Sequence, residues 1–341
     1  MLLDAVDNRV FPGCVFGYVD AGREPTVIAV GGHTYEQTAL MTVDSVFDVA
    51  SVTKVVPTSS IALQLVETGA LGLDDRVRSF IPELSGRHSE AVTIRHLLTH
   101  TAAFNLRMSA LKELEPEAVL HAVFSANLNC APGASFSYSN AASLLLGIII
   151  ERTTGRSLDV LAAERFFVPL GMNRTTFDPG RFDREQIVPT EIDPWRGREI
   201  RGEIHDESAW KLRSVMVPGS AGLFTTAGDL LKFCGMMICG GTVNGMRFFS
   251  SETLRQITTN QIPQTGECTG LGWEYNQPRY MGRSALQLIG KTGFTGCVIM
   301  CGLMRGQAMV LLSNYTWPRR KPDKTAIDRT RACIADLVFS R

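Results

Sequence analysis

The sequence predicts an α+β fold in which strands from both ends of the chain share one antiparallel sheet. β-rich runs are concentrated in residues 1–55 and 241–341, whereas residues 56–240 are mainly helical in pattern. With 341 residues and 45% hydrophobic side chains, the chain can bury a large core. We therefore expect a single domain, residues 1–341, whose sheet lobe is flanked by helices and carries a large, mainly helical inserted lobe.

The N-terminal elements are a short amphipathic segment, a hairpin and a long helix. Residues 14–19 and 26–30 are β-rich, and Asp20–Gly22 between them is typical of a hairpin turn. A helical pattern then covers residues 51–69. Pro57 lies inside it, where a proline removes a backbone hydrogen bond, so we expect a kink or irregular first turns.

Capping residues and glycines divide the helical middle of the chain. The caps expected are Thr93, Ser157 and Thr226, and Gly155 and Gly240 end two helices. The expected helices cover residues 94–98, 116–125, 141–152, 157–167, 226–238 and 250–258.

Residues 178–219 interrupt this pattern with a polar, proline-containing stretch that carries Trp195 and Trp210. A long loop inside a compact chain is usually functional or disordered, and we expect this one to be functional, as one wall of a cleft between the lobes. His205 and Asp206 in this loop could also be the dyad of a Ser-His-Asp enzyme. The chain lacks the G-x-S-x-G motif of such hydrolases, which argues against that alternative.

The C-terminal part returns to strands. Residues 270–275, 285–291, 297–304 and 308–312 are β-rich runs separated by turn residues, which is typical of an antiparallel sheet. The amphipathic pattern of residues 324–339 predicts a final helix. Since these strands and the N-terminal hairpin lie at opposite ends of the chain, one shared sheet is the simplest arrangement.

The strongest candidate for chemistry is Ser51, which lies three residues before Lys54 at the start of a helix. Residues at this spacing share one helical face, so the amine can reach the hydroxyl. A serine needs a neighbouring base to become a nucleophile, and free N–H groups at a helix start favour the negative charge that develops. An isolated S-x-x-K is more often only a capping serine followed by a surface lysine.

Two further motifs change that balance. Tyr138-Ser139-Asn140 precedes the apolar helix at residue 141, and Lys291-Thr292-Gly293 lies on an expected strand. With Ser51 and Lys54, this set resembles the serine β-lactamase and penicillin-binding protein family. The Tyr-x-Asn form is typical of its class C β-lactamase-like group, which includes DD-peptidases, D-aminopeptidases and family VIII carboxylesterases. The resemblance covers nearly the whole chain and implies the β-lactamase/transpeptidase-like fold.

The resemblance also implies catalytic roles. Ser51 would be the acylated nucleophile and Lys54 its proton partner. Tyr138 would act as general base toward Ser51 or protonate the leaving group, because Lys54 and Lys291 favour its phenolate. The sequence leaves open which group removes the Ser51 proton.

Substrate-binding roles follow in the same way. Asn140 would hold a substrate amide. Lys291 and Thr292, followed by Gly293, would bind a substrate carboxylate or maintain the Tyr138 network. The backbone N–H groups of Ser51 and Phe294 would form the oxyanion hole.

The implied function is a serine hydrolase acting on D-amino-acid amides or peptides, small esters or β-lactams. The alternatives are a penicillin-binding protein with slow deacylation and a non-catalytic member that binds or senses ligands. Two departures from the family's pattern, Ala102-Ala103 and Ser220, are expected near the cleft rim, where they would affect substrate preference.

Composition bounds the partners. Lys plus Arg and Asp plus Glu number 34 each, so we expect no nucleic-acid partner, and no apolar run is long enough to span a membrane. Met1–Val10 lacks the pattern of a secretory signal, which favours a cytoplasmic location without excluding a processed exported form. The eight cysteines, without a C-x-x-C pair, are expected to be reduced core residues. The expected partner is a small-molecule or short peptide substrate.

No cofactor or metal is expected. His96 and His100 have the i, i+4 spacing of a metal pair but lack the glutamate of H-E-x-x-H, so hydrogen bonding at a helix end is the preferred interpretation. Arg319–Lys321 is a short basic cluster that we expect to be a solvated turn.

Overall fold

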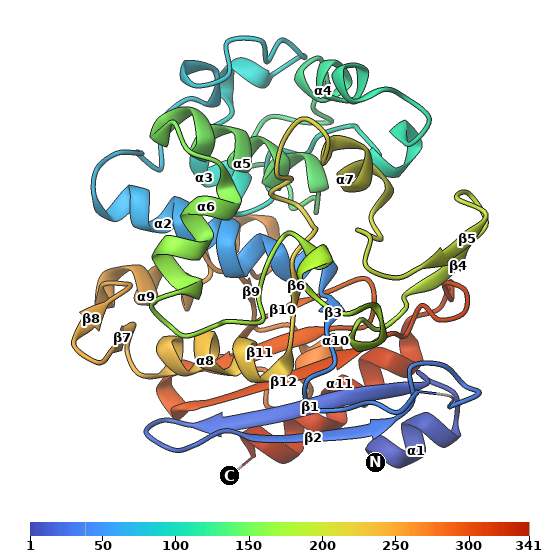
Figure 1. Cartoon of the computed structure of the whole chain (residues 1–341). Coiled ribbons are helices and arrows are strands. Elements are labelled where there is room, and N and C mark those ends of the chain that lie inside the picture. The colour runs from blue at the N-terminus through green and yellow to red at the C-terminus, as the bar shows by residue number, and fades with distance from the viewer. Residues whose placement is uncertain (38, 341) are drawn as a thin grey trace.

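The computed structural model describes residues 1–37 and 39–340, and it has the expected α+β architecture (Figure 1). The main sheet consists of strands from both ends of the chain: β1 (Gly13–Asp20), β2 (Thr26–Gly31), β9 (Glu274–Tyr275), β10 (Ile289–Thr292), β11 (Val298–Gly302) and β12 (Gln307–Ser313). Its order is β2-β1-β12-β11-β10-β9, with antiparallel neighbours throughout. The prediction of one shared terminal sheet is therefore confirmed.

Helices fill the middle of the chain and cover the sheet. They are α1 (Leu2–Asp7), α2 (Ser60–Glu67), α3 (Ile94–Leu98), α4 (Pro116–Phe124), α5 (Asn140–Thr154), α6 (Leu158–Ala162), α7 (Glu207–Leu212), α8 (Ala227–Ile238), α9 (Ser251–Ile257), α10 (Pro278–Met281) and α11 (Thr325–Phe339). Three short strand pairs complete the fold: β3 (Phe47–Asp48) with β6 (Phe224–Thr225), β4 (Glu191–Asp193) with β5 (Arg198–Ile200), and β7 (Thr242–Val243) with β8 (Met246–Arg247).

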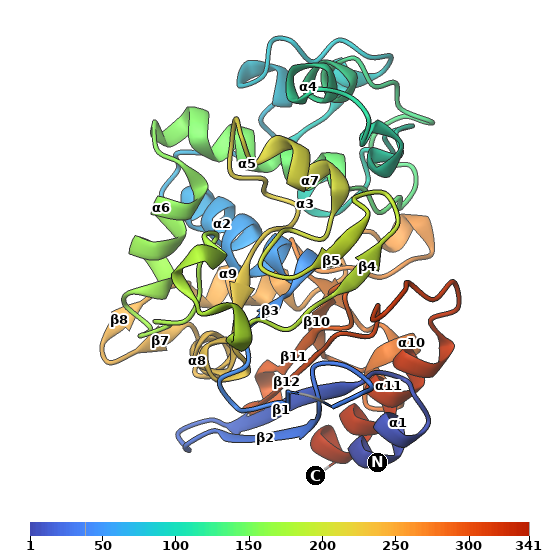
Figure 2. The ribbon, with the colours of Figure 1, turned by 45° about the vertical axis from the view of Figure 1, so that its right-hand side comes forward.

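The central strands β11 and β12 are buried on both faces, whereas the edge strand β2 is partly exposed. Along β11, Ile299 and Cys301 belong to the core shared with the helical lobe, while Val298 and Met300 belong to a second core against α11. This alternation follows from the two-residue period of a strand. Helix α8 packs directly on the first face of the sheet, although it lies within residues 56–240, which were expected to form the helical lobe. Helices α1 and α11 cover the opposite face (Figures 1 and 2).

The C-terminal strands are shorter than the sequence predicted. Gly272 has φ of 76°, a left-handed conformation that interrupts an extended run, so β9 contains only Glu274–Tyr275. Residues 285–288 form a turn closed by the Leu288 N–H and the Ala285 carbonyl, and β10 begins at Ile289. These expected strand boundaries at 270 and 285 were therefore wrong.

The segment that begins at Ala50 has irregular helical geometry, as expected from Pro57. Ala50–Lys54 is a 3₁₀ turn, Val55–Ser59 is a π turn that contains Pro57, and regular helix begins only with α2. Ala50 itself is buried and has φ of 46°. A non-glycine residue in this region is strained, so the surrounding packing must hold it there.

The loop over residues 178–219 contains ordered structure, namely the β4–β5 hairpin and α7 (Figure 2). The rings of Trp195 and Trp210 lie 5.7 Å apart, and the Arg196 guanidinium lies 4.8 Å from the Trp210 ring centroid. The segment is therefore held in part by contacts among its own side chains.

The cysteines only partly match the expectation of core residues. Cys14, Cys234, Cys297 and Cys301 are buried, whereas the other four are exposed or partly exposed. In residues 1–37 and 39–340, no helix combines the length and apolar character needed to cross a membrane.

Candidate active site

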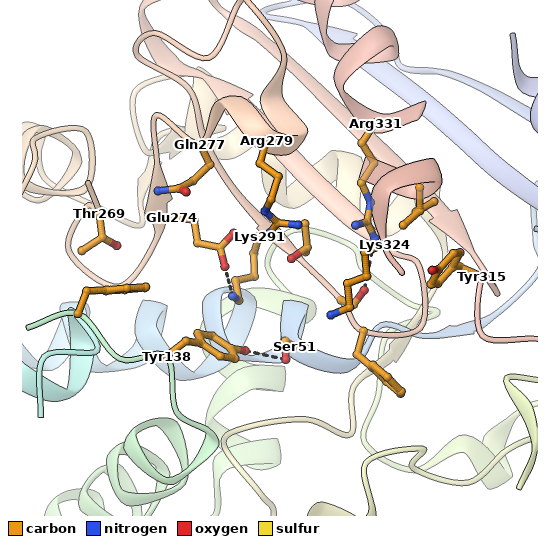
Figure 3. A pocket seen from close by; sticks show the side chains of 15 residues that line it. Ser51, Tyr138, Thr269, Glu274, Gln277, Arg279, Lys291, Tyr315, Lys324 and Arg331 are labelled. Atoms are coloured by element: carbon orange, nitrogen blue, oxygen red, sulfur yellow. Dashed lines mark hydrogen bonds and ion pairs between the residues drawn. The ribbon is translucent and has the colours of Figure 1, made fainter. Parts of the chain in front are cut away.

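Ser51 lies between the side chains of Lys54 and Tyr138. Lys54 Nζ donates to Ser51 Oγ at 2.9 Å. The Tyr138 hydroxyl donates to the same oxygen at 2.9 Å (Figure 3). In a 3₁₀ turn, side chains at i and i+3 lie one above the other, so this local geometry brings Lys54 directly to Ser51. Lys54 also donates to the carbonyl of Ser220 at 2.6 Å, which fixes its position.

Lys291 connects Tyr138 with a carboxylate that the sequence analysis missed. Its ammonium lies 4.2 Å from the centre of the Tyr138 ring and forms an ion pair with Glu274 on the neighbouring strand (Figure 3). Glu274 also accepts a hydrogen bond from the Tyr280 hydroxyl at 2.6 Å. The sequence did carry one signal for Glu274, since it is the single charged residue in the otherwise uncharged β-rich run of residues 270–275.

These charges shift the proton affinities of the cluster. Loss of water around the Tyr138 hydroxyl favours the neutral phenol, but Lys291, Lys54 and the Ser51 hydroxyl outweigh this and lower its pKa. Burial, and then the charge of Lys291, lower the pKa of Lys54. Burial also opposes the charge on Lys291, but Glu274 and Tyr138 outweigh it, and the pKa of Lys291 is raised. Lys291 is therefore the permanent cation, while Lys54 and Tyr138 are the groups suited to exchange a proton.

The two histidines of the expected helix end have separate roles. His96 Nδ1 accepts the Thr93 N–H at 3.1 Å and completes a helix cap, as preferred from the sequence. His100 lies instead against Tyr138, with ring centres 4.7 Å apart, and its Nδ1 accepts the Ser139 N–H at 3.4 Å. Burial, Lys291 and Lys54 hold the pKa of His100 well below its usual value, so it is neutral. The described residues contain no metal-binding group of three or more His, Cys, Asp or Glu.

The third motif lines a cavity of about 370 Å³ beside Ser51. Thr292, Gly293 and Phe294 form one wall of it. A Cβ atom on Gly293 would lie 2.4 Å from the Val49 carbonyl oxygen, so only glycine lets the chain directly after β10 pass this close to the segment before Ser51.

The far end of the same cavity is cationic. Arg279, Lys324 and Arg331 line it together with Lys291 (Figure 3). Glu274 is the one carboxylate among the described residues that line it, and Asp328 behind the wall pairs with both Arg279 and Arg331, so four cations stand against two carboxylates. The cavity is therefore suited to a substrate that carries a negative charge near the bond to be cleaved.

Asn140 does not line this cavity. It lines a second hollow of about 440 Å³, formed with residues 104–109, that Tyr138 also borders. Its Nδ2 donates to the carboxylate of Asp206 at 2.9 Å.

His205 is not a partner of Ser51, so the structure contains no Ser-His-Asp arrangement there. His205 is fully buried, and its ring Nε2 lies 2.8 Å from the Glu191 carboxylate. Its backbone N–H donates to the Asp48 carboxylate at 2.7 Å. Its ring packs at 4.8 Å from that of Phe294, so the loop supports the cavity wall from behind.

The basic turn and the two departures from the family's pattern have more partners than the sequence indicates. Arg320 is exposed, as expected of a turn, but it also forms ion pairs with Glu191 and Glu207, each at 2.8 Å, and lies 5.2 Å from the Phe294 ring centre. Ser220 and Ala102-Ala103 are buried, and the Ser220 carbonyl contacts Lys54. The sequence does not reveal these contacts because the partners are distant in the chain.

Asp48 is a further residue that the sequence analysis missed. It is buried, and besides the His205 N–H it accepts the Ala50 N–H at 2.8 Å. The carboxylate thereby joins the strained residue before Ser51 to the loop that supports Phe294. Burial raises the pKa of Asp48 despite these hydrogen bonds.

Comparison with known proteins agrees with this geometry. A family model described as Beta-lactamase matches residues 2–332. A protein of Escherichia coli (strain K12) named "Putative D-alanyl-D-alanine carboxypeptidase" is 29% identical over 316 residues, which cover 83% of this chain and 72% of that protein.

Solved structures of similar fold are known from several sources. The octameric penicillin-binding protein homologue from Pyrococcus abyssi has a TM-score of 0.75 at 22% identity, covering 98% of this chain and 77% of that one. EstCE1, a hydrolase with promiscuous acyltransferase activity, has a TM-score of 0.73 at 20% identity, covering 97% of this chain and 96% of that one. These two likenesses concern the fold.

Proposed function

The chain belongs to the Beta-lactamase family of serine hydrolases, and we propose that it cleaves short D-amino-acid peptides through an acyl-enzyme on Ser51. The observation that carries the proposal is the hydrogen-bonded cluster of Ser51, Lys54 and Tyr138 at one end of a cavity whose other end is cationic. The similarity to a protein named for D-alanyl-D-alanine carboxypeptidase supports the same substrate class.

In the proposed reaction, Ser51 Oγ attacks the carbonyl carbon of the scissile amide while its proton passes to the Lys54–Tyr138 pair. The N–H groups of Ser51 and Phe294 stabilise the tetrahedral oxygen. Tyr138 then donates a proton to the leaving nitrogen as the C–N bond breaks. Water then adds to the carbonyl carbon of the acyl ester and gives a proton to the same pair. As the bond from that carbon to Ser51 Oγ breaks, the pair passes the proton to Oγ, which releases the acid and regenerates Ser51.

The cationic end of the cavity favours a leaving group that carries a negative charge. Lys291 and Thr292 lie next to Ser51, with Arg279, Lys324 and Arg331 beyond them. A free carboxylate on the leaving amino acid would be bound there by charge-assisted hydrogen bonds, each worth about 1.5–3 kcal/mol. A simple ester has no group for these cations, so a carboxylated peptide is the better substrate.

The first test compares N-acetyl-D-alanyl-D-alanine with the same dipeptide carrying a C-terminal carboxamide. We expect the free acid to be hydrolysed at least about tenfold faster, which is the loss expected for one charge-assisted hydrogen bond. The Ser51→Ala variant, checked by circular dichroism, should release no D-alanine. Release by the folded variant contradicts the nucleophile, and equal rates for the two dipeptides contradict the carboxylate site.

Intact-protein mass spectrometry after brief exposure to a β-lactam complements this assay. A mass increase in wild type that is absent from Ser51→Ala supports the acyl-enzyme, and its lifetime distinguishes a slowly deacylating penicillin-binding protein from a β-lactamase. If neither dipeptide nor β-lactam reacts, hydrolysis of a small ester favours the esterase alternative. Failure of all three substrates favours a non-catalytic ligand-binding protein.

A further inference from the structure

Asp48 on β3 has no part in the proposed steps, yet its carboxylate is bound at both oxygens close to Ser51. The side chain is buried, and each oxygen accepts one backbone N–H. Oδ1 accepts the Ala50 N–H at 2.8 Å, and Oδ2 accepts the His205 N–H at 2.7 Å. A buried carboxylate is costly unless its oxygens are hydrogen-bonded, so these two bonds are strongly favoured. Asp48 therefore ties two separate segments of the chain to one point.

The first segment carries the N–H of Ser51. Ala50 has φ of 46°, and the bond from its N–H to Asp48 stabilises this strained conformation. The carbonyl of the peptide between Ala50 and Ser51 accepts the Thr53 hydroxyl at 2.6 Å, which fixes the plane of that peptide. In the part of the chain that the structure describes, the Ser51 N–H donates to no protein group. It is therefore available to a substrate oxygen.

The second segment carries the N–H of Phe294, two residues after β10 ends. The Thr295 hydroxyl donates to the backbone carbonyl of Asp48 at 2.8 Å. The ring of His205, whose N–H is bound to Asp48, lies 4.8 Å from the ring of Phe294. Within residues 1–37 and 39–340, the Phe294 N–H likewise donates to no protein group. Ser51 and Phe294 both line the cavity of about 370 Å³, so two available donors meet there.

We propose that Asp48 is a positioning residue that sets the directions of the Ser51 and Phe294 N–H groups and thereby aligns the oxyanion hole. The inference rests on the proposed function, in which these two groups bind the oxygen of the tetrahedral intermediate. Their contribution depends on geometry, because each donor must lie about 2.7–3.1 Å from the position that this oxygen takes in the transition state. A residue bound to both segments keeps both donors at that position.

A purely structural role for Asp48 predicts a different result. If Asp48 only stabilised the fold, its replacement would lower the melting temperature without changing the preference for oxygen over sulfur in the scissile carbonyl. A change in proton transfer or in leaving-group binding would affect both substrates alike, since they share the nucleophile and the leaving group. A change in the oxyanion hole alters the ratio of their rates, because sulfur is larger than oxygen and a weaker hydrogen-bond acceptor.

The experiment uses the thioester of N-acetyl-D-alanine with thioglycolate and the matching dithioester, in which C=S replaces C=O. In both, Ser51 Oγ bonds to the carbon of that group, and the C–S bond to thioglycolate breaks as this leaving group takes up the proton that Ser51 loses. The value of kcat/KM, which covers the steps up to this release, is measured by chromatography of thioglycolate, with Ser51→Ala as background.

We expect wild type to prefer the thioester. Removal of one oxyanion donor costs about 10²–10³-fold in kcat, and misalignment of one donor should cost part of this, so we expect the preference to fall by about tenfold or more in Asp48→Asn. Asparagine has nearly the same shape but only one acceptor oxygen, and its NH₂ group would face the second backbone N–H. One of the two segments is therefore released.

Two further variants separate the roles. Thr295→Val removes the hydroxyl bound to the Asp48 carbonyl and should lower the same ratio from the Phe294 side. Asp229→Asn is the matched control, because Asp229 is a buried carboxylate that accepts the Arg174 N–H at 2.7 Å but is not among the described residues that line the cavity. It should retain the wild-type ratio, whatever its effect on the melting temperature.

The outcomes are distinct. A lower ratio in Asp48→Asn with the wild-type ratio in Asp229→Asn supports the inference. An unchanged ratio in folded Asp48→Asn, an equal fall in Asp229→Asn, or equal rates for the two substrates in wild type overturn it and leave the proposed hydrolase intact. If Asp48→Asn does not fold, Thr295→Val decides by the same criteria. Release of thioglycolate from neither substrate by wild type overturns the proposed function, and the inference with it.

Discussion

At the scale of single residues, the site depends on the charges around one phenol. Lys54 and Lys291 lie 5.4 and 4.2 Å from the centre of the Tyr138 ring, and both lower its pKa. Glu274 keeps Lys291 charged, so Lys291 also lowers the pKa of Lys54. The pKa values of both candidate bases for Ser51, Tyr138 and Lys54, thus depend on the charge of Lys291.

Replacing Lys291 should therefore move the pH profile in one direction. A nearby cation favours the deprotonated form of both Tyr138 and Lys54, so Lys291→Met raises the pKa of each. The group that accepts the Ser51 proton is then deprotonated only at higher pH. We expect the acidic limb of kcat/KM to shift upward by about one pH unit or more.

The control for this measurement is Lys291→Arg, which keeps the positive charge and should leave the limb close to its wild-type position. An acidic limb that stays in place in Lys291→Met would show that Lys291 does not set the proton affinity of the base.

At the scale of elements, the segment that carries Ser51 combines a strained residue with two non-standard helical turns. Ala50 has φ of 46°, and its N–H is bound by the buried carboxylate of Asp48. The 3₁₀ turn that follows places Lys54 on Ser51, and the π turn accommodates Pro57 before α2 begins. Packing against β6 and the turn after β10 stabilises a conformation that the local sequence does not prefer.

This strain makes position 50 selective for small residues. We expect Ala50→Gly to change the free energy of unfolding by less than about 1 kcal/mol, since glycine adopts positive φ freely. Ala50→Val should lower it by about 1–3 kcal/mol, because a β-branched residue is strained in this region and the site is buried. Urea unfolding followed by tryptophan fluorescence measures both.

The matched control is Ala118→Val, at an exposed position of α4, where only helix propensity changes and the cost stays below about 0.7 kcal/mol. If valine is no more costly at position 50 than at position 118, the positive φ of Ala50 is not a source of strain.

At the scale of the whole molecule, the site is held between two cores that share one sheet. Residues of β11 and β12 alternate between the core under the helical lobe and the core against α11. Packing contributed by both ends of the chain thus brings the S-x-x-K turn against β10, and Tyr138 lies beside Ser51 and Lys291 there (Figure 3).

Loss of apolar contact in the second core should weaken the entire fold. Leu311 on β12 is fully buried in that core, and we expect Leu311→Ala to lower the free energy of unfolding by about 2–5 kcal/mol. Leu337→Ala on α11 is the control, because Leu337 is 59% exposed and its truncation should cost no more than about 0.5 kcal/mol. Equal losses at the two positions would mean that α11 does not close a core at Leu311.

The sequence by itself determined the fold class, the strands near both termini and the residues of the three motifs. Hydrophobic period, caps and turn residues are local signals, and S-x-x-K places Ser51 beside Lys54 within a single turn. The cytoplasmic location and the individual roles of the site residues stay predictions. Strand lengths were the weakest part, because a positive φ such as that of Gly272 leaves little trace in a β-rich run.

Only the tertiary structure decided which charged groups support the site. Glu274 lies beside Lys291, Asp206 accepts a hydrogen bond from the amide of Asn140, and Arg320 pairs with Glu191 and Glu207. Each of these contacts joins residues that lie far apart in the chain, and its strength depends on how deeply the charged groups are buried. The physical reason is that electrostatic and hydrogen-bond energies depend on distance and solvent exposure in space, which sequence spacing does not encode.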